Sequence, residues 1–331
     1  MRGAMPRLIR ACALLFAVAA SVAANPPSAN AQTYPDRPVR ILVPYAPGGI
    51  TDIAARVLGA KLGEVWGHQV VVENRAGGNG LIAMSAAVKA EPDGYTLVMA
   101  SGGDVSLNPA LLEKMPYDVE RDLIPISGVS DAPIVLAANS NSPFGSVADV
   151  IAAAKAKPGS IDIGTPGVGS ITHLVLEWLA LSTGTKFQNV PFKGGAPAVQ
   201  ALISGVVPLA ILASSSVAPY VRSGSLRVLG VMSPARSPLN PEWPTLREQG
   251  VAEVNGSNWT ALFAPKGTPQ PIVDKLNADV VKALEAPEVK ERFNSGGAQA
   301  TPSTPGELAA RQKNELAIFR SVVEKSGMHI E

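Results

Sequence analysis

Three glycine-rich turns in this sequence carry residue types suited to holding an anion. The first, Tyr45-Ala46-Pro47-Gly48-Gly49, follows the apolar run Val39–Val43 and precedes an amphipathic segment that begins at Thr51. This order predicts a strand, a turn and a helix. Glycines let a ligand approach the backbone closely, and the start of a helix offers free N–H groups and the positive end of the helix dipole. The turn therefore suits a carboxylate, although an ordinary strand-to-helix turn capped by Thr51 or Asp52 fits the same residues.

Two further turns of this kind lie in the second half of the chain. Thr165-Pro166-Gly167-Val168-Gly169-Ser170 leads into a predicted helix that bears His173, and Phe192-Lys193-Gly194-Gly195 leads into another helix. If the three turns converge, their backbone N–H groups and hydroxyls can enclose one carboxylate. A hydrogen bond to a charged group contributes about 1.5–3 kcal/mol, so a few such bonds are enough for micromolar binding.

Each polar or aromatic side chain in these turns has two interpretations. His173 either contacts the ligand or is hydrogen-bonded to the neighbouring loop, and Lys193 either pairs with a ligand carboxylate or is a solvated loop residue. Asp52 falls where acids stabilise a helix start, which favours a loop-bracing role over that of a catalytic base. Tyr45 and Phe192 either contact the apolar part of a ligand or pack against loops.

The sequence offers little support for an enzyme. It contains no G-x-G-x-x-G or Walker phosphate loop, no G-x-S-x-G nucleophile turn and no H-E-x-x-H metal motif. The three histidines, His68, His173 and His329, are not clustered. A hydrolase that uses Ser170 and His173 remains an alternative, but no acid that would orient the histidine is apparent. We expect no cofactor and no metal.

The elements that must position these turns alternate between strand and helix, which is typical of parallel α/β structure. One series runs from Val39 to a second glycine-rich loop, Ala100-Ser101-Gly102-Gly103-Asp104, at the carboxyl end of a predicted strand, where open α/β sheets bind ligands. A second series runs from the strand 134–138 to 232. After a strand at 258–264, the chain is mainly helical, with helix starts expected at Thr268 and about Thr304. We therefore predict a discontinuous first domain, with crossings near 130 and 257.

The first residues have the pattern of an export signal. Three arginines precede the apolar stretch Ala11–Ala24, and the small-residue site Ala29-Asn30-Ala31 follows it, which predicts cleavage after about Ala31. The single cysteine, Cys12, lies inside this stretch, so the mature chain is predicted to have no thiol. Cleavage would leave 25 basic and 27 acidic residues, a balance that does not point to nucleic acid.

A set of motifs, in a fixed order from Tyr34 to the C-terminus, resembles the Bug-type solute receptors of tripartite tricarboxylate transporters. The motifs that carry the resemblance are PYAPGGITDIAAR, VENRAGGNG, PDGYTLVMAS, NPALLEKMPYD, GTPGVGSITHL, VPFKGGAPAVQALISG, GSLRVLGVMSPAR, PTLREQG and NWTALFAPKGTP. The resemblance implies an α/β, two-lobed periplasmic-binding-protein clamshell with a cleft between its lobes. The expected parts are a signal peptide (1–31), a first lobe (32–130 plus 257–331) and a second lobe (131–256).

The resemblance also implies which residues bind the solute. They belong to the glycine turns and to two loops, Ser101–Asn108 and Ala213–Ser216, in which family members differ. The expected ligand-binding residues are Tyr45, Pro47, Gly48, Gly49, Thr51, Asp52, Ser101, Asn108, Thr165, Gly169, Ser170, His173, Lys193, Gly194, Gly195 and Ser214. Two departures concern the second-lobe wall: Pro208 stands where the family has an aspartate, and Phe192 replaces a tyrosine.

The function predicted from these observations is that of a periplasmic receptor without a chemical step. It would close over a small carboxylate, a dicarboxylate or tricarboxylate, an acidic amino acid or an aromatic carboxylate, and deliver it to a two-component membrane permease. We expect a monomer. The alternatives are the hydrolase and a receptor that serves as the ligand sensor of a signalling partner.

Overall fold

The computed structural model describes residues 34–251 and 254–329, and the part of it from Arg37 onward forms one compact unit. The predicted signal peptide, its cleavage site after Ala31 and Cys12 lie outside the described residues. Within the described residues, no helix combines the length and the apolar character needed to cross a membrane.

The first group of strands follows the alternation predicted from the sequence. Strand β1 (Val39–Val43) pairs in parallel with β2 (Val70–Asn74) and β3 (Thr96–Ser101). Strand β9 (Ser257–Pro265) then runs antiparallel to β3. Helices α2 (Ile50–Trp66) and α3 (Leu81–Val88) contact these strands, and α10 (Gln270–Glu285) and α11 (Pro287–Ser295) pack against α2. A chain segment far along the sequence thus completes the first sheet.

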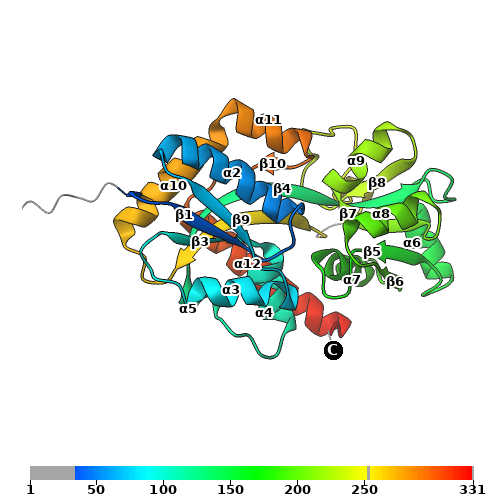
Figure 1. The fold of residues 1–331 in the computed structure, drawn as a ribbon. Helices are drawn as coiled ribbons and strands as arrows, with labels where there is room; N and C mark the ends of the chain where they lie inside the picture. The colour runs from blue at the N-terminus through cyan, green and yellow to red at the C-terminus, as the bar shows by residue number, and fades with distance from the viewer. Residues whose placement is uncertain (1–33, 252–253, 330–331) are drawn as a thin grey trace, which may run out of the picture. The chain divides into compact units, whose positions relative to one another are not determined.

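Strand β4 (Leu123–Asn139) joins two groups of strands (Figure 1). Residues 123–133 pair with β9, and Ser130 and Asp131 also pair with the short β10 (Gln299–Ala300). From Ile134 onward, β4 pairs instead with β7 (Leu209–Ala213) and β8 (Leu226–Val231). The sequence predicted a strand only from 134 to 138, because Pro125, Gly128 and Pro133 interrupt the apolar pattern before it. The predicted strand was therefore too short.

The second group of strands extends from β7 to β5 (Asp162–Thr165) and then to β6 (Gln188–Pro191), both in parallel. Its helices are α6 (Val147–Ala156), α7 (Ile171–Thr183), α8 (Gly195–Ile203) and α9 (Ser214–Arg222). Pro208, which lacks an N–H group, lies just before β7, and its carbonyl accepts a hydrogen bond from the Asn139 amide at 3.3 Å. A proline is therefore compatible with the start of this strand.

The last helix, α12 (Pro305–Ser326), packs against both groups of strands. Near its start, Leu308 is buried with Trp259 and Phe263 of β9. Near its end, Phe319 and Val322 are buried in the same cluster as residues of α7, among them Leu174 and Leu179. The sequence predicted that this helix packs back on the first domain; its second half also contacts α7.

Helix caps explain several of the element boundaries. Ser146 and Thr304 form capping boxes with Asp149 and Glu307 at the starts of α6 and α12, and the second of these starts was expected from the sequence. Thr268 does not cap α10, because its hydroxyl donates to the Pro265 carbonyl at 2.8 Å. The remaining short helices are η1 (Gly78–Gly80), η2 (Gly103–Leu107), α4 (Asn108–Leu111), α5 (Val119–Asp122) and η3 (Arg247–Gln249).

Candidate ligand-binding site

The turn after β1 is held by the carboxylate of Asp52. This buried carboxylate accepts hydrogen bonds from the Gly48 amide (2.9 Å), from Asn74 Nδ2 (2.9 Å) and from Arg56. Burial alone would raise the pKa of Asp52, but the hydrogen bonds from Arg56, Gly48 and Asn74 outweigh it and lower that pKa. Asp52 therefore braces the turn, the role that the sequence favoured for it, and the amide of Gly48 already has a partner within the protein.

Three amides at the start of α2 remain available to an anion. The first intrahelical hydrogen bond is donated by Ile53 to the Gly49 carbonyl, so the amides of Ile50, Thr51 and Asp52 have no intrahelical acceptor. Thr51 is buried, whereas Pro47, Gly48 and Gly49 are exposed. The turn thus presents an accessible backbone beside the positive end of a helix dipole.

A second buried carboxylate, Asp104, ties this turn to the end of β3. Its two oxygens accept hydrogen bonds from the Ser101 amide and hydroxyl (both 2.7 Å) and from the Tyr45 hydroxyl (3.0 Å). The Tyr45 hydroxyl also lies 3.0 Å from Ser101 Oγ. Burial and the charge of Asp104 raise the pKa of Tyr45 well above its usual value, so the phenol stays neutral. Sequence reasoning singled out Tyr45 and Ser101 but missed the carboxylate between them.

The segment 101–108 is not the loop that the sequence predicted. Gly103–Leu107 forms a helical turn of the wide, five-residue type, and Asn108 begins α4. Asn108 is buried. Its side-chain Nδ2 donates to the backbone carbonyl of Asn79 (2.9 Å), and its Oδ1 accepts from Asn79 Nδ2 (2.8 Å). Asn108 therefore fixes the turn 77–80, whose Asn79 has a positive φ of 53°.

The turn after β5 is organised around Ser170, which caps α7. Its hydroxyl donates to the Gly167 carbonyl (2.7 Å) and accepts from the His173 backbone amide (3.2 Å). The Gly169 amide donates to Nδ1 of His173 (3.3 Å), so this amide, too, has a partner within the protein. Thr165 is buried and donates to Asn189 Oδ1 (2.7 Å), a residue that the sequence analysis did not single out.

His173 is hydrogen-bonded to the neighbouring loop, which is the second of the two interpretations given for it above. Its Nδ1 accepts from Gly169, and its Nε2 lies 3.7 Å from Oε1 of Glu177. Burial lowers the pKa of His173 and raises that of Glu177, which favours neutral forms of both groups. Among the described residues, no hydrogen bond joins the His173 ring to the Ser170 hydroxyl. The pair therefore lacks the contact through which a general base activates a nucleophile.

The turn after β6 packs on the turn after β5. The Phe192 amide donates to the Thr165 carbonyl, and the Gly194 amide donates to the Pro166 carbonyl, both at 2.8 Å. Gly194 has a φ of 107° and opens α8, whose first intrahelical bond runs from Ala198 to Gly194. The Gly195 amide is therefore available beside the helix start. Lys193 is exposed, and no ion pair includes it within residues 34–251 and 254–329.

The last predicted residue, Ser214, forms its hydrogen bond with a residue outside these turns. It is buried at the start of α9, and its hydroxyl donates to the Gly297 carbonyl at 3.4 Å. The structure thus groups the predicted residues into two constellations, Tyr45–Asp52 with Ser101, and Thr165–His173 with Gly194 and Gly195. In the part of the chain that is described, no cluster of three or more potential metal-ligating side chains occurs.

Comparisons with known proteins connect this arrangement to one family. The model of the tripartite tricarboxylate transporter family receptor (TctC) matches residues 54–328. Protein BugT of Bordetella pertussis is 37% identical over 328 residues, which cover 99% of each chain.

Two solved structures are similar throughout. R. palustris Rpa4515 with adipate has a TM-score of 0.80 and 32% identity, over 89% of this chain and 99% of that one. MatC from Rhodopseudomonas palustris with bound malate has a TM-score of 0.76 and 31% identity, over 88% of this chain and all (100%) of that one. The predicted fold, an α/β, two-lobed periplasmic-binding-protein clamshell, is confirmed.

Proposed function

Because this chain belongs to the Bug-type receptors of the tripartite tricarboxylate transporter family, we propose that it is an extracytoplasmic receptor for a small carboxylate. The observation that carries the proposal is that two similar proteins of the same fold hold adipate and malate, both of which are dicarboxylates. The family membership confirms the resemblance read from the sequence motifs. The ligand class and delivery to a two-component membrane permease belong to the proposal.

The proposed site combines the turns that open α2, α7 and α8. Helix starts stabilise negative charge, and the free amides of Ile50, Thr51 and Gly195 can donate to a carboxylate without any bulk positive charge. The buried carboxylates and the histidine hold these turns in shape. We assign the sixteen residues predicted from the sequence to this site, with Asp52, Asn108 and His173 as bracing residues.

We propose two lobes with the predicted bounds, 32–130 plus 257–331 and 131–256. The change of partner along β4 after Pro133, and the start of β9 at Ser257, support crossings near these positions. A ligand that contacts both lobes only when they are closed would shift the population toward the closed form. Within this mechanism the protein carries out no chemical step. Among the described residues, no hydrogen bond joins the His173 ring to the Ser170 hydroxyl, which argues against the hydrolase.

A titration of the chain from Gln32 onward tests the proposal. Calorimetry with adipate and malate is expected to give one site with a micromolar dissociation constant for at least one of them. The matched neutral and cationic compounds, 1,6-hexanediol and 1,6-hexanediamine, are expected not to bind. Binding of either control at the same affinity as the acids would remove the carboxylate from the proposal.

Replacing Gly49 by valine is expected to weaken carboxylate binding at least tenfold. Gly49 has an extended backbone (φ −79°, ψ 168°), and a Cβ there would meet only the Ala46 carbonyl oxygen, at 3.9 Å. The protein itself therefore has room for the side chain, which would block the ligand from the start of α2. Calorimetry measures the affinity, and circular dichroism checks the fold.

Gly306→Val is the matched control for this variant. Gly306 also lies at a helix start, in α12, and a Cβ there would have no neighbour within 4 Å. Its affinity for the carboxylate is expected to equal that of the unmodified chain. Equal affinity in Gly49→Val and Gly306→Val would place the ligand away from the first turn.

The location is part of the proposal as well. The pattern of residues 1–31 and the family support export to the periplasm with cleavage after about Ala31. The two possible partners would respond differently to the liganded receptor. A permease would take up the solute, whereas a signalling partner would change its own activity without any uptake of the solute. Solute uptake by cells that lack this receptor would decide against transport.

A further inference from the structure

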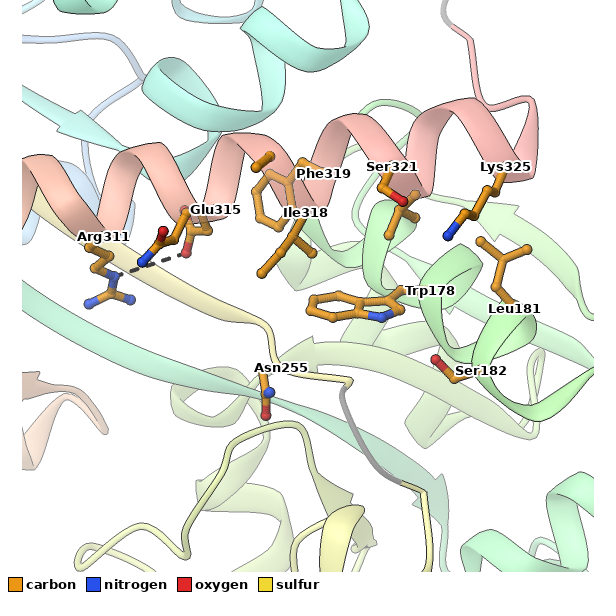
Figure 2. Close-up of a pocket in the computed structure, with 13 residues that line it drawn as sticks. Trp178, Leu181, Ser182, Asn255, Arg311, Glu315, Ile318, Phe319, Ser321 and Lys325 are labelled. Carbon is orange, nitrogen blue, oxygen red and sulfur yellow. Dashed lines mark ion pairs between the residues drawn. The ribbon is translucent and has the colours of Figure 1, made fainter.

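A cavity of about 970 Å³ lies between α7 and α12 (Figure 2). Helix α12 contributes Arg311, Glu315 and Ile318, and α7 contributes Trp178 and Leu181. None of the residues predicted for the carboxylate site lines this cavity. Its volume lies within the range of small-molecule sites, about 300–1,000 Å³.

One wall of the cavity is apolar and partly open to solvent. In Figure 2, Ile318 of α12 points toward the indole of Trp178, and Leu181 lies beyond Trp178 along α7. Leu181 and Ile318 are each 41% exposed, although most large apolar side chains among residues 34–251 and 254–329 are at least partly buried. A flat apolar group placed against Trp178 and Ile318 would shield both side chains from water.

The two ends of the cavity differ in whether their charged side chains already have partners within the protein. At one end, Arg311 is held by Asp131 Oδ2 (2.8 Å) and stacks over the Trp259 ring, while both oxygens of Glu315 accept from Trp259 Nε1 at 2.8 Å. At the other end, Lys325 is exposed, and no ion pair among the described residues includes it. The cation that is free to meet a ligand is therefore Lys325.

We propose that this cavity is a second binding site, separate from the carboxylate site, for a small amphipathic anion. Its aromatic or similarly flat body lies against Trp178 and Ile318, and its anionic group pairs with Lys325. Other polar side chains that line the cavity, Asn255, Asn314, Ser182 and Ser321, can hydrogen-bond to substituents on the body. The occupant fits the chemistry of an aryl carboxylate, because such a molecule joins one flat apolar face to one negative charge.

Calorimetry with 2-naphthoate and its neutral analogue 2-naphthylmethanol tests the proposal on the chain from Gln32 onward. Ser182→Trp places a large side chain in the cavity from an exposed position of α7 and is expected to abolish the binding of both compounds there. Lys325→Gln is expected to weaken 2-naphthoate about tenfold and to leave 2-naphthylmethanol unchanged. Lys325→Arg is expected to retain both.

A matched control separates filling of the cavity from the mere addition of an aromatic side chain. Val206→Trp places the same side chain at a residue that is 68% exposed and outside the cavity, so it is expected to bind both compounds as the unmodified chain does. Binding of 2-naphthoate that persists fully in Ser182→Trp would overturn the proposal. This result is independent of the adipate titration, because no residue changed here belongs to the carboxylate site.

Discussion

Two buried carboxyl groups, Asp104 and Glu315, are expected to contribute a loss of stability as the pH rises from 4 to 7, because they resist ionisation. Burial raises the pKa of Asp104 from 3.8 to about 6, despite the hydrogen bonds from Ser101 and Tyr45. Burial likewise raises the pKa of Glu315 from 4.5 to about 7, despite Arg311 and the Trp259 indole. Both groups therefore keep their protons in the folded state at pH values where the unfolded chain has lost them.

The sign of the effect follows from proton linkage. Between the unfolded and the folded pKa the folded state binds more protons, so the free energy of unfolding falls with increasing pH. One pKa unit corresponds to about 1.4 kcal/mol, so each carboxyl group costs the folded state roughly 3 kcal/mol once the pH exceeds both of its pKa values. The window is about pH 4 to 6 for Asp104 and about pH 4.5 to 7 for Glu315.

Urea unfolding at several pH values, with neutral variants, measures these contributions one at a time. Relative to the unmodified chain, Asp104→Asn and Glu315→Gln are expected to gain stability as the pH rises through their respective windows. Glu307→Gln is a control of opposite sign on the same helix as Glu315, because hydrogen bonds from Thr304 lower the pKa of Glu307. Curves for Asp104→Asn and Glu315→Gln that run parallel to the unmodified chain would contradict the prediction.

The sequence predicted local structure well where the signal was local. The bounds of β1 match the apolar run Val39–Val43, and Ser146, Ser170 and Thr304 cap helices because each hydroxyl reaches an amide three residues further along the chain. These features depend on neighbouring residues only, and so they can be read without a structure.

The features that the sequence did not predict depend on partners far along the chain. The first half of β4 is a strand because β9, more than 120 residues away in sequence, supplies its hydrogen bonds. The segment 101–108 is helical, and its Asp104 meets the Tyr45 hydroxyl, 59 positions earlier. Pairing between segments so far apart leaves no pattern in one sequence. For the same reason, Asp52 could be placed near the site without naming the groups that it holds, and the role of Asp104 was missed.

Replacing Gly80 by alanine is expected to lower the free energy of unfolding by about 3–5 kcal/mol. Gly80 has a φ of +90°, and a Cβ there would lie only 2.1 Å from Oδ1 of Asp104. The left-handed backbone alone costs an L-residue roughly 1–2 kcal/mol. The remainder comes from displacing a buried carboxylate from Ser101 and Tyr45, since each hydrogen bond to a charged group contributes about 1.5–3 kcal/mol.

Two comparisons isolate the clash with Asp104 from the backbone strain. Gly184→Ala has the same kind of backbone (φ +62°) but no neighbour within 4 Å of the added Cβ, so it is expected to cost only about 1–2 kcal/mol. In an Asp104→Ala background, where the carboxylate is absent, Gly80→Ala is expected to cost no more than Gly184→Ala does. A penalty for Gly80→Ala that is the same in both backgrounds would show that the two residues act independently. A smaller penalty in the Asp104→Ala background would instead show that residue 80 must lack a Cβ for Asp104 to hold Tyr45 and Ser101 beside the proposed carboxylate site.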